Sequence, residues 1–511
     1  MQTTSRRTLA AALAVLCSLS MVAPVVAGPS ATGPSAGVPA AASAQNATDE
    51  APNPCVGTMA SPANGTTVIS VQGFQFGKNG GKRPAKLVGV GPSGEIRWVH
   101  QSAEKYGVVW GYDVDPMDNG NLFVTATLQN HTTLVYEFDP ETQEQVWSKT
   151  FDLGDTHDAD LINNGSEILL ANMRNYNATA GRNDDRIFVY NRTTEQIEWE
   201  WRFDDHYDRR NLEENYTDDW THVNDVDKIG DGLYLASPRN FDQAIVVNRS
   251  TNEIVMKLGE DGKKGILAEQ HNPDYLESEN GTPALLVGDS ENDRIVEYAN
   301  PDGDLTNGSG WTRTWTLKGD LNWPRDADRL PSGNTLVTDS SNHRVLEVTP
   351  NGTVVWEFYA PWLVYDAARI PAGEHGGPTM TDLNATGTYQ LRGDTDRNRT
   401  ELRQCHRVLR NVSGLADGRT PSNASDAGET TEGAMDDESS ESDGSDAPGS
   451  GEETTSGDGE SANNGSDATT GEGDATSDTA STGVPGFGPL AALAGLFTAF
   501  VALGVGTRRS R

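Results

Sequence analysis

Histidine and arginine side chains recur at matching places along this chain, and they are the residues best suited to chemistry. His157, His222 and His271 lie within or just before copies of a short polar phrase, and Arg325 opens a later copy. Near neutral pH a histidine can act as a base, an acid or a covalent nucleophile. An arginine can bind an oxyanion through two parallel hydrogen bonds. Together these residue types suit the transfer of a sulfuryl or phosphoryl group.

The alternative is that these positions pair with neighbouring aspartates and only brace a repeat. An aspartate follows the first position of the phrase in nearly every copy, as at Asp158, Asp225 and Asp326. It is also present where the first residue is Tyr112 rather than histidine. We therefore expect the aspartates to be scaffold, and function to lie at the first position, where the copies differ.

The phrase marks an internal repeat. Its copies are residues 112–115 (YDVD), 157–160 (HDAD), 224–227 (NDVD), 271–274 (HNPD) and 325–328 (RDAD). Each is followed by a turn and β-rich strands, and each unit ends on a strand that usually carries tryptophan. These closing positions are Trp98, Trp147, Trp199, Met256, Trp315 and Trp356, separated by 49, 52, 57, 59 and 41 residues.

Repeats of roughly 40 to 50 residues with several short strands are typical of β-propeller blades. Six closing strands predict an all-β, six-bladed propeller within residues 55–410, with its blades over about residues 66–380. An array of β-sandwiches is the rival architecture. In a propeller, residues just ahead of the innermost strands gather around one mouth of the central channel.

Several other kinds of site are not supported. The chain has no HExxH, no CxxC and no EF-hand loop, so no metal site is predicted. A glycine-rich phosphate loop and a GxSxG elbow are also missing from the sequence, which leaves a serine hydrolase without support.

A set of linked motifs between residues 219 and 298 resembles the bacterial arylsulfate sulfotransferase family. They are THVND at 221–225, DG at 231–232, SPRN at 237–240, QHN at 270–272 and GDS at 288–290, followed by Arg294. The resemblance implies a six-bladed propeller that moves a sulfuryl group from an aryl sulfate donor to a phenolic acceptor. It also implies a ping-pong reaction through a sulfated histidine, with no nucleotide, metal or other cofactor.

Site residues follow from this resemblance position by position. His222 and His271 match two channel histidines of the family, Arg294 is the expected anion-binding arginine, and Arg239 is the second choice. The family's nucleophile belongs to a later blade, where this chain has Arg325 in place of a histidine. The other candidates for a base or nucleophile are His157, His343 and His375.

The rival function is a non-catalytic propeller that serves as a binding module at the cell surface. Arg325 favours it, because this residue stands where the family pattern leads us to look for the nucleophile. Acceptor-dependent turnover of an aryl sulfate would separate the two hypotheses.

The acidic composition argues against a nucleic-acid partner. The net charge is -36, from 75 acidic and 39 basic residues, whereas phosphate binding needs clustered Lys and Arg. The acidic excess resembles that of secreted glycoproteins of halophilic archaea. So does the set of Asn-x-Ser/Thr sequons, among them Asn130, Asn177, Asn191, Asn215 and Asn307.

The N-terminal region reads as an export signal. Residues 1–27 combine Arg6-Arg7 with an apolar run, which predicts a signal peptide cleaved at a point between 27 and 44. Both the twin-arginine and the general export routes stay open. Outside the cell Cys55 and Cys405, which flank the propeller, are expected to form a disulfide; two free thiols are the alternative.

The C-terminal region predicts a surface anchor. Residues 416–482 form an acidic Ser/Thr/Gly spacer expected to be disordered, and an apolar helix at 489–506 ends in basic residues. Residues 483–511 resemble the PGF-CTERM sorting signal of archaeal surface proteins through Pro485-Gly486-Phe487. This resemblance implies processing by an archaeosortase-type enzyme, lipid attachment and a place on the outer face of the membrane. A plain transmembrane anchor is the alternative.

Overall fold

The computed structural model describes residues 53–72, 84–212, 214–302, 305, 310–371 and 376–416. The predicted signal peptide, the acidic spacer beyond residue 416, the C-terminal tail and His375 lie outside these residues. Among the helices that are described, none is both long and apolar enough to cross a membrane.

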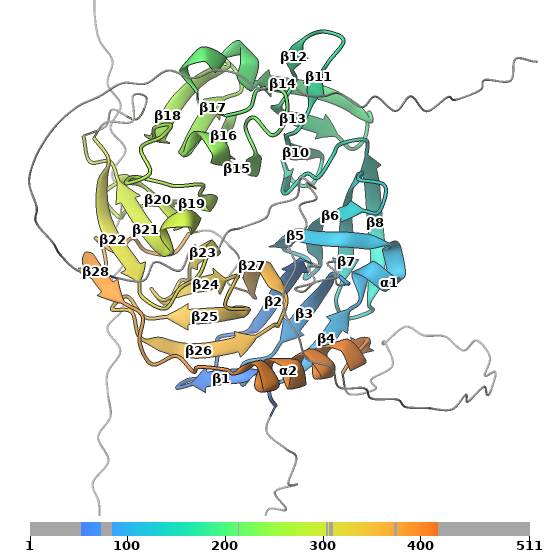
Figure 1. The fold of residues 1–511 in the computed structure, drawn as a ribbon, viewed down its shortest axis with the longest axis vertical. Coiled ribbons are helices and arrows are strands. Elements are labelled where there is room, and N and C mark those ends of the chain that lie inside the picture. The colour runs from blue at the N-terminus through green and yellow to red at the C-terminus, as the bar shows by residue number, and fades with distance from the viewer. Residues whose placement is uncertain are drawn as a thin grey trace, which may run out of the picture. The chain divides into compact units, whose positions relative to one another are not determined.

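Six four-stranded antiparallel units surround a central axis and form a β-propeller (Figure 1). Blade 1 holds β5 (Val108–Pro116), β6 (Leu122–Leu128), β7 (Thr133–Asp139) and β8 (Glu144–Phe151). Blade 2 holds β9 (Ala159–Ile162), β10 (Glu167–Asn172), β13 (Arg186–Asn191) and β14 (Gln196–Arg202), and carries the small hairpin β11 (Tyr176–Asn177) and β12 (Arg182–Asn183). Blade 3 holds β15 (Val223–Gly230), β16 (Leu233–Pro238), β17 (Gln243–Asn248) and β18 (Glu253–Gly259).

The other three blades follow the same order. Blade 4 holds β19 (His271–Glu277), β20 (Pro283–Asp289), β21 (Arg294–Ala299) and β22 (Thr312–Lys318). Blade 5 holds β23 (Pro324–Arg329), β24 (Thr335–Asp339), β25 (Arg344–Val348) and β26 (Val354–Tyr359). Blade 6 combines β27 (Leu363–Ile370) with β2 (Thr66–Gln72), β3 (Lys86–Val90) and β4 (Ile96–His100).

The circle closes because the last inner strand pairs with the first strand of the propeller. β27 runs antiparallel to β2, with Ile370 opposite Thr66 and Leu363 opposite Gln72. Blade 6 is therefore built from both ends of the domain. The prediction of six blades is confirmed.

The recurring closing-strand residues lie on the outermost strand of each four-stranded unit, as predicted from the repeat. Their packing explains why tryptophan is favoured at this place. The indole N–H of Trp315 donates to the carbonyl of Pro350 at 2.9 Å, and that of Trp356 donates to Pro92 at 3.2 Å. Each bond reaches the outer turn of the following blade, so these tryptophans fasten neighbouring blades while filling the core between them.

The polar phrase lies one strand further in than the sequence indicated. We expected it just ahead of the innermost strand, whereas residues such as Asp113 and Asn224 belong to the innermost strands β5 and β15 themselves. The apolar strand that follows, for example β6, is the second strand of its blade. The alternation pattern missed the inner strands because polar residues pack there around the axis.

A break in register accompanies the phrase in five blades. The ladders shift between Gly111 and Val114 in β5, and equivalent shifts occur in β15, β19, β23 and β27. A β-bulge places two residues opposite one and re-aims their side chains. The column residue and the aspartate after it can therefore both face the axis.

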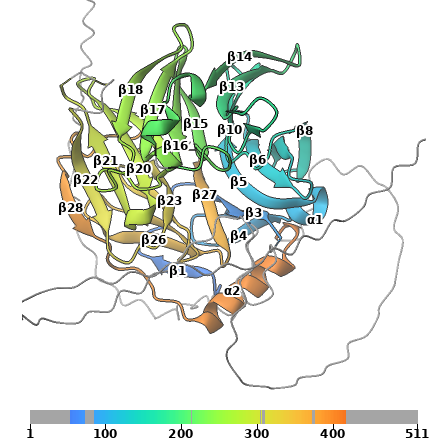
Figure 2. The ribbon, with the colours of Figure 1, turned by 45° about the horizontal axis from the view of Figure 1, so that its top comes forward.

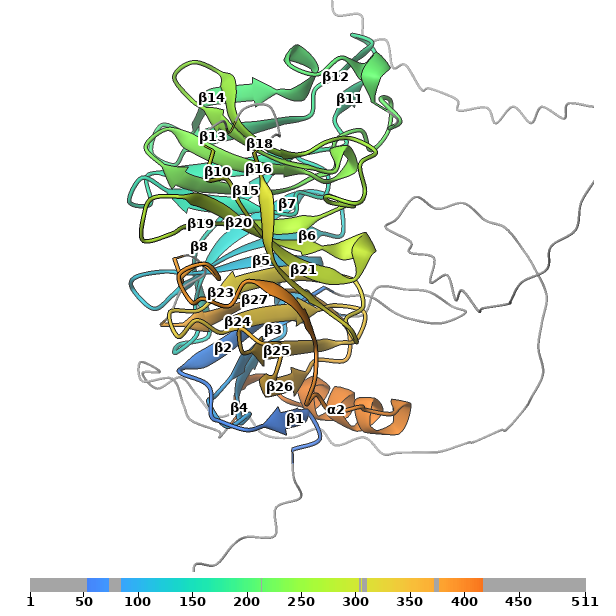
Figure 3. The same ribbon diagram turned by 90° about the vertical axis from the view of Figure 1, so that its left-hand side faces the viewer.

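The C-terminal segment crosses the outside of three blades. β28 (Gly387–Gln390) adds to β22 of blade 4, Arg392 bridges to Thr353 of blade 5, and β29 (Gly414–Leu415) adds to β4 of blade 6. Between them, α2 (Arg399–Asn411) packs beside β1 (Val56–Met59), the extra edge strand of blade 5 (Figures 2 and 3). The shorter helices are α1 (Ser102–Tyr106), η1 (Phe203–Asp205), η2 (Arg209–Asn211), η3 (Arg239–Phe241) and η4 (Ser290–Asn292).

A disulfide joins Cys55, just ahead of β1, to Cys405 in α2. Both cysteines are fully buried in one hydrophobic cluster with Trp362 and Phe358. The bridge thus links the two ends of the described domain.

A buried ion pair between blades 4 and 5 leads to a stability prediction. Arg329 Nη1 lies 3.0 Å from Glu297 Oε2, and neither side chain is exposed. Replacing Glu297 with Gln would leave the Arg329 charge buried without its counter-charge, so we expect a loss of about 3–5 kcal/mol in the free energy of unfolding. Denaturant unfolding measures this loss.

The matched control is Glu95→Gln, which breaks a surface pair with Arg97 whose side chains are about half exposed. That change should cost less than about 1 kcal/mol. Equal losses in the two variants would contradict the prediction.

Candidate functional site

Six positions on the inner strands, or in the case of His157 just ahead of one, meet at the propeller axis, one from each blade. We call them the column residues: Tyr112, His157, Asn224, His271, Arg325 and Tyr365. The first five were expected from the repeated phrase. Tyr365 was missed, although Tyr365-Asp366 after the last closing strand is a shortened sixth copy of that phrase.

Tyr365 is the residue that joins the column. Its ring lies 5.0 Å from Tyr112, 5.5 Å from His157 and 6.2 Å from His271, between ring centroids. The Arg325 guanidinium lies 5.1 Å from the same ring. These contacts from four other blades show that the column residues form one buried cluster rather than six separate sites.

His222 lies beside this cluster and makes polar contacts with Asp219, Arg174 and Arg239. Its ring lies 5.0 Å from that of His157, and its Nδ1 lies 2.5 Å from Asp219 Oδ2. Because a carboxylate only accepts, Nδ1 bears a hydrogen, and because a guanidinium only donates, the Nε2 lone pair accepts from Arg239. On the Nε2 side, Nη1 of Arg239 lies 3.3 Å away.

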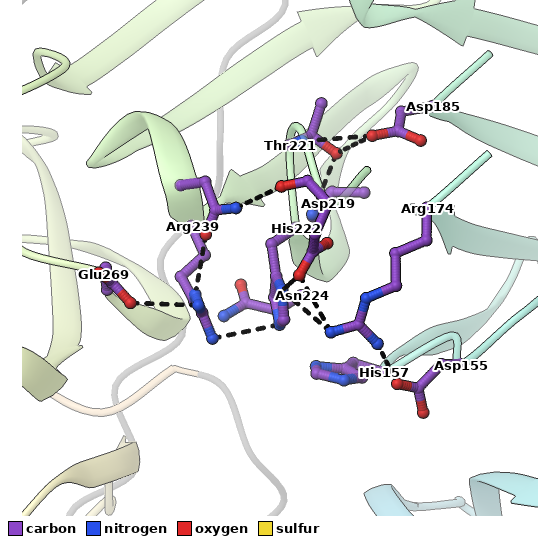
Figure 4. Close-up of polar contacts among 12 residues, drawn as sticks. Asp155, His157, Arg174, Asp185, Asp219, Thr221, His222, Asn224, Arg239 and Glu269 are labelled. Atoms are coloured by element: carbon purple, nitrogen blue, oxygen red, sulfur yellow. Dashed lines mark hydrogen bonds and ion pairs between the residues drawn. The ribbon is translucent and has the colours of Figure 1, made fainter. Parts of the chain in front are cut away.

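Two arginines flank the Asp219–His222 pair (Figure 4). Arg174 bonds to Asp155 and lies 3.0 Å from Asp219 and 3.4 Å from His222 Nδ1. On the other side, Arg239 forms an ion pair with Glu269 at 3.1 Å. Burial alone would raise the pKa of Asp219, but His222 and Arg174 hold it well below its usual range. Asp219 is therefore a carboxylate able to orient the imidazole.

The backbone around His222 is held in place by the surrounding loop. The Thr221 hydroxyl donates to Asp185 at 2.8 Å, and Asn240 Nδ2 donates to the Asp219 carbonyl at 2.6 Å. His222 itself has a φ of 41°, a left-handed conformation that costs a non-glycine residue energy. Such strain persists only where neighbours enforce it, and here it aims the imidazole at the axis.

A chain of hydrogen bonds through Ser290 orients His271. Ser290 Oγ donates to the Pro324 carbonyl at 2.8 Å, so the bond of 2.8 Å between Ser290 and His271 must be donated by Nδ1. His271 Nε2 then also keeps its lone pair. Burial, followed by Arg325 and Arg239, lowers the pKa of His271 well below its usual range, so it is neutral.

The remaining predicted site residues are spread more widely. Arg325 Nη1 donates to Gln72 at 2.7 Å and its guanidinium stacks 3.5 Å from Trp323. The Arg294 Nε atom bonds to Asp289 at 2.5 Å and its Nη2 atom to the carbonyls of Gly265 and Ile266. Gly265 and Ile266 belong to the connection between β18 and β19, and none of these described bonds of Arg294 leads to a histidine.

His343 lies at the turn between β24 and β25, where its Nδ1 is 2.7 Å from the Trp362 carbonyl.

The structure therefore gathers His157, His222, His271, Arg239 and Arg325, together with Asp219, Arg174 and Tyr365, which were not among the predicted site residues. Asp219 could have been found three residues ahead of His222. Arg174 lies in a loop after β10 and follows no repeat, so no sequence pattern marks it.

His157 leads to a prediction of pH-dependent stability. Burial lowers its pKa well below the ordinary value of 6.5, and His222 and Arg174 lower it further. As the pH falls below 6.5, His157 becomes protonated in the unfolded chain but stays neutral in the folded protein. Protonation therefore stabilises the unfolded state, and the native state loses stability. The His157→Gln variant cannot titrate. Between about pH 7.5 and about pH 5 it should gain up to about 2 kcal/mol relative to the parent protein.

Denaturant unfolding of both proteins at the two pH values measures this difference. The value at the higher pH serves as the internal reference, since it removes the cost of the substitution itself. A difference between the proteins that does not change with pH would contradict a buried neutral imidazole.

Comparison with known proteins bears on the same region. Residues 68–291 match the family model Arylsulfotransferase (ASST). The match begins in β2, ends in η4, and contains His157, Asp219, His222, Arg239 and His271. It supports a transferase of the arylsulfotransferase type at the level of the family.

Solved structures match this chain only weakly. A protein of unknown function from Bacteroides caccae is 11% identical, with 66% of this chain and 100% of that chain covered and a TM-score of 0.39. The Pseudomonas aeruginosa periplasmic gluconolactonase PpgL is 14% identical, with 63% and 89% covered and a TM-score of 0.39. Similarities this weak carry no argument about activity. No curated protein matches the chain.

Proposed function

We propose that this protein transfers a sulfuryl group from an aryl sulfate ester to a phenol, with His222 as the residue that carries the group. The observation that supports this most directly is the Asp219–His222 pair held between Arg174 and Arg239. The arylsulfotransferase match over the same residues supports the reaction class. Arg239, beside the imidazole, takes the role that we first expected for Arg294.

In the first half-reaction, Arg239 turns from Nε2 of His222 to the sulfuryl oxygens of the aryl sulfate, and the freed Nε2 lone pair attacks the sulfur. An N–S bond forms as the S–O bond to the aryl group breaks, and the aryl group leaves as a phenolate that keeps the bonding pair and takes up a proton from solvent. Asp219 steadies the positive charge on the imidazole, as a buried carboxylate does for a histidine in acyl transfer. Arg239, on the Nε2 side, stabilises the sulfuryl oxygens, while Arg174, on the Nδ1 side, holds the Asp219 carboxylate in place.

In the second half-reaction, the oxygen of an acceptor phenol attacks the sulfur and the N–S bond breaks. The incoming phenol must lose its proton to a base. His271 suits this role because it is neutral and keeps a lone pair on Nε2. Tyr112, Tyr365 and Trp323 are buried beside these histidines, and we expect a phenol ring to pack against them.

The alternative is a non-catalytic binding module at the cell surface, in which the column residues are structural. The ion pairs of Arg174 with Asp155 and of Arg239 with Glu269 favour this reading, since they already neutralise both arginines. Arg325, in place of a later histidine, favours it too.

Incubation of the purified full chain with p-nitrophenyl sulfate, with and without a phenol, tests the proposal. We expect nitrophenol release that depends on the acceptor, and a mass increase of one SO₃ group on the protein when the acceptor is left out. The absence of nitrophenol release across a range of donors and acceptors would leave the binding module as the better account.

We also propose that the protein works outside the cell, tethered through its C-terminal region. This rests on the N- and C-terminal sequence patterns and on the buried disulfide, since such bonds form and persist in oxidising compartments. Cell fractionation with the membrane, followed by protease treatment of intact cells, tests it. A protein that resists protease until the cells are broken would contradict this location.

A further inference from the structure

A chain of polar contacts runs from blade 1 to His222, and it begins at Asp155. This residue lies in the segment between β8 and β9, and its side chain is buried. One carboxylate oxygen, Oδ1, accepts from the Tyr112 hydroxyl and, at 3.2 Å, from the Thr127 hydroxyl. The other oxygen, Oδ2, accepts from Nη1 of Arg174. Asp155 therefore joins strands β5 and β6 of blade 1 to a loop of blade 2.

The contacts of Arg174 continue this chain to the histidine that we propose carries the sulfuryl group (Figure 4). While Nη1 of Arg174 bonds to Asp155, its Nη2 donates to Oδ2 of Asp219 at 3.0 Å. The same Oδ2 accepts from Nδ1 of His222 at 2.5 Å. Because a guanidinium is planar and rigid, the position of Asp155 sets the direction from which Arg174 meets Asp219.

The Asp219 carboxylate needs this support because only one of its oxygens is held. Its Oδ1 is buried without a hydrogen-bond partner among the residues that the structure describes. The bond from Asn240 reaches the backbone carbonyl of Asp219 rather than the carboxylate. A carboxylate held through one oxygen can rotate about that contact and carry Oδ2 away from the imidazole of His222. The bond from Arg174 to Oδ2 opposes this rotation.

Both partners of the ion pair between Asp155 and Arg174 hold an uncommon backbone conformation. Asp155 has a φ of 59° and Arg174 a φ of 55°, in the left-handed region that non-glycine residues seldom adopt. Such conformations persist where surrounding contacts enforce them. The pairing of these two side chains is one such contact, so the backbone is arranged to bring them together.

We propose that Asp155 is a positioning residue for sulfuryl transfer, an inference that rests on the function proposed above. Asp155 acts through Arg174, whose guanidinium it orients so that Asp219 stays on Nδ1 of His222. The hydroxyl of Tyr112 in turn holds Asp155. This tyrosine therefore serves the site through its hydroxyl as well as through its ring.

Kinetics of the full chain with p-nitrophenyl sulfate and a phenol test this role. Asp155→Asn keeps the size of the side chain but removes the charge that holds Arg174. We expect kcat to fall about 10- to 100-fold while KM for the donor changes by less than about 3-fold. Tyr112→Phe keeps the ring stacked on His157 but loses the hydroxyl, so kcat should fall about 3- to 10-fold. The matched control is Asp152→Asn, at an exposed aspartate of the same segment, which should keep the parent values.

A double variant separates positioning from general damage to the fold. If Asp155 acts through Asp219, then Asp155→Asn should cost nothing further in kcat when Asp219 is already replaced by asparagine. A structural defect unrelated to Asp219 would instead lower kcat by the same factor in both backgrounds.

A spectroscopic measurement of the same contact needs no turnover. The proton on Nδ1 of His222 lies in a short, charge-assisted hydrogen bond, so its NMR signal is expected far downfield. Loss of the signal in His222→Ala assigns it. Asp155→Asn should shift this signal upfield because the bond to Asp219 lengthens, and Asp152→Asn should leave it in place.

Three results would overturn the proposal: an unchanged kcat in Asp155→Asn, losses that multiply in the double variant, or an Nδ1 signal that does not move. If the parent protein transfers no sulfuryl group, the proposed function fails, and the Nδ1 signal alone then decides whether Asp155 positions His222. If Asp155→Asn does not fold, Tyr112→Phe takes its place in all three measurements, because it weakens the same chain of contacts and keeps every charge.

Discussion

Replacing Asp219 by asparagine is expected to lower the turnover of sulfuryl transfer by about 10²- to 10⁴-fold, with little change in the binding of the donor. The Asp219 carboxylate now accepts from Nδ1 of His222 at 2.5 Å and so leaves the lone pair on Nε2. The amide of asparagine can donate to Nδ1 instead, which moves the hydrogen to Nε2. An imidazole in that tautomer has no lone pair directed at the sulfur.

The measurement is kcat and KM with p-nitrophenyl sulfate and a phenol, together with the yield of sulfated protein. Asp218→Asn is the matched control, because Asp218 is the exposed neighbour of Asp219 and should leave both constants unchanged. A His222→Ala variant should lose the sulfated species completely. Retention of the sulfated species in His222→Ala would show that another residue, with His157 as the nearest candidate, carries the group.

Removing the disulfide is expected to lower the free energy of unfolding by about 2–5 kcal/mol. The bond between Cys55 and Cys405 closes a sequence separation of 350 residues, so it restricts the unfolded chain strongly. It also fixes α2 against β1, where both sulfurs are buried with Trp362. Loss of the bond frees the C-terminal segment that crosses blades 4, 5 and 6.

The comparison is between the parent and the Cys55→Ser/Cys405→Ser variant in denaturant. A reducing agent should bring the parent close to the variant and should not change the variant further, which is the internal control. Equal midpoints for the oxidised parent and the variant would show that β27 and β2 close the circle without help from the bridge.

Much of the architecture was readable from the sequence because the repeat is carried by local patterns. Trp147, Trp315 and Trp356 recur on outer strands because each fills the same space between blades, and two of the three bond to the next outer turn. The inner strands were harder to place, since their polar residues face a narrow axis rather than an apolar core. Alternation of apolar residues therefore marked the second strand of each blade as if it were the innermost one.

The candidate site was only partly readable. Arg294 follows a family motif, yet Asp289 and two carbonyls take up its hydrogen bonds, whereas Arg239 lies 3.3 Å from His222. Arg174 belongs to a loop of blade 2 and meets His222 of blade 3 only through the fold. Spacing along the chain cannot foretell contacts that arise when separate blades are brought side by side.

The sequence by itself determined the blade count, the polar phrase and the histidine and arginine types at its first position, because each depends on residues close together in the chain. The tertiary structure decided which of those residues meet. Closure of the ring by β27 brought Tyr365 into the column, and strained turns turned His222 toward Asp219 and Arg239. Both outcomes depend on contacts between residues far apart in the chain, whose geometry is set only when all six blades pack around one axis.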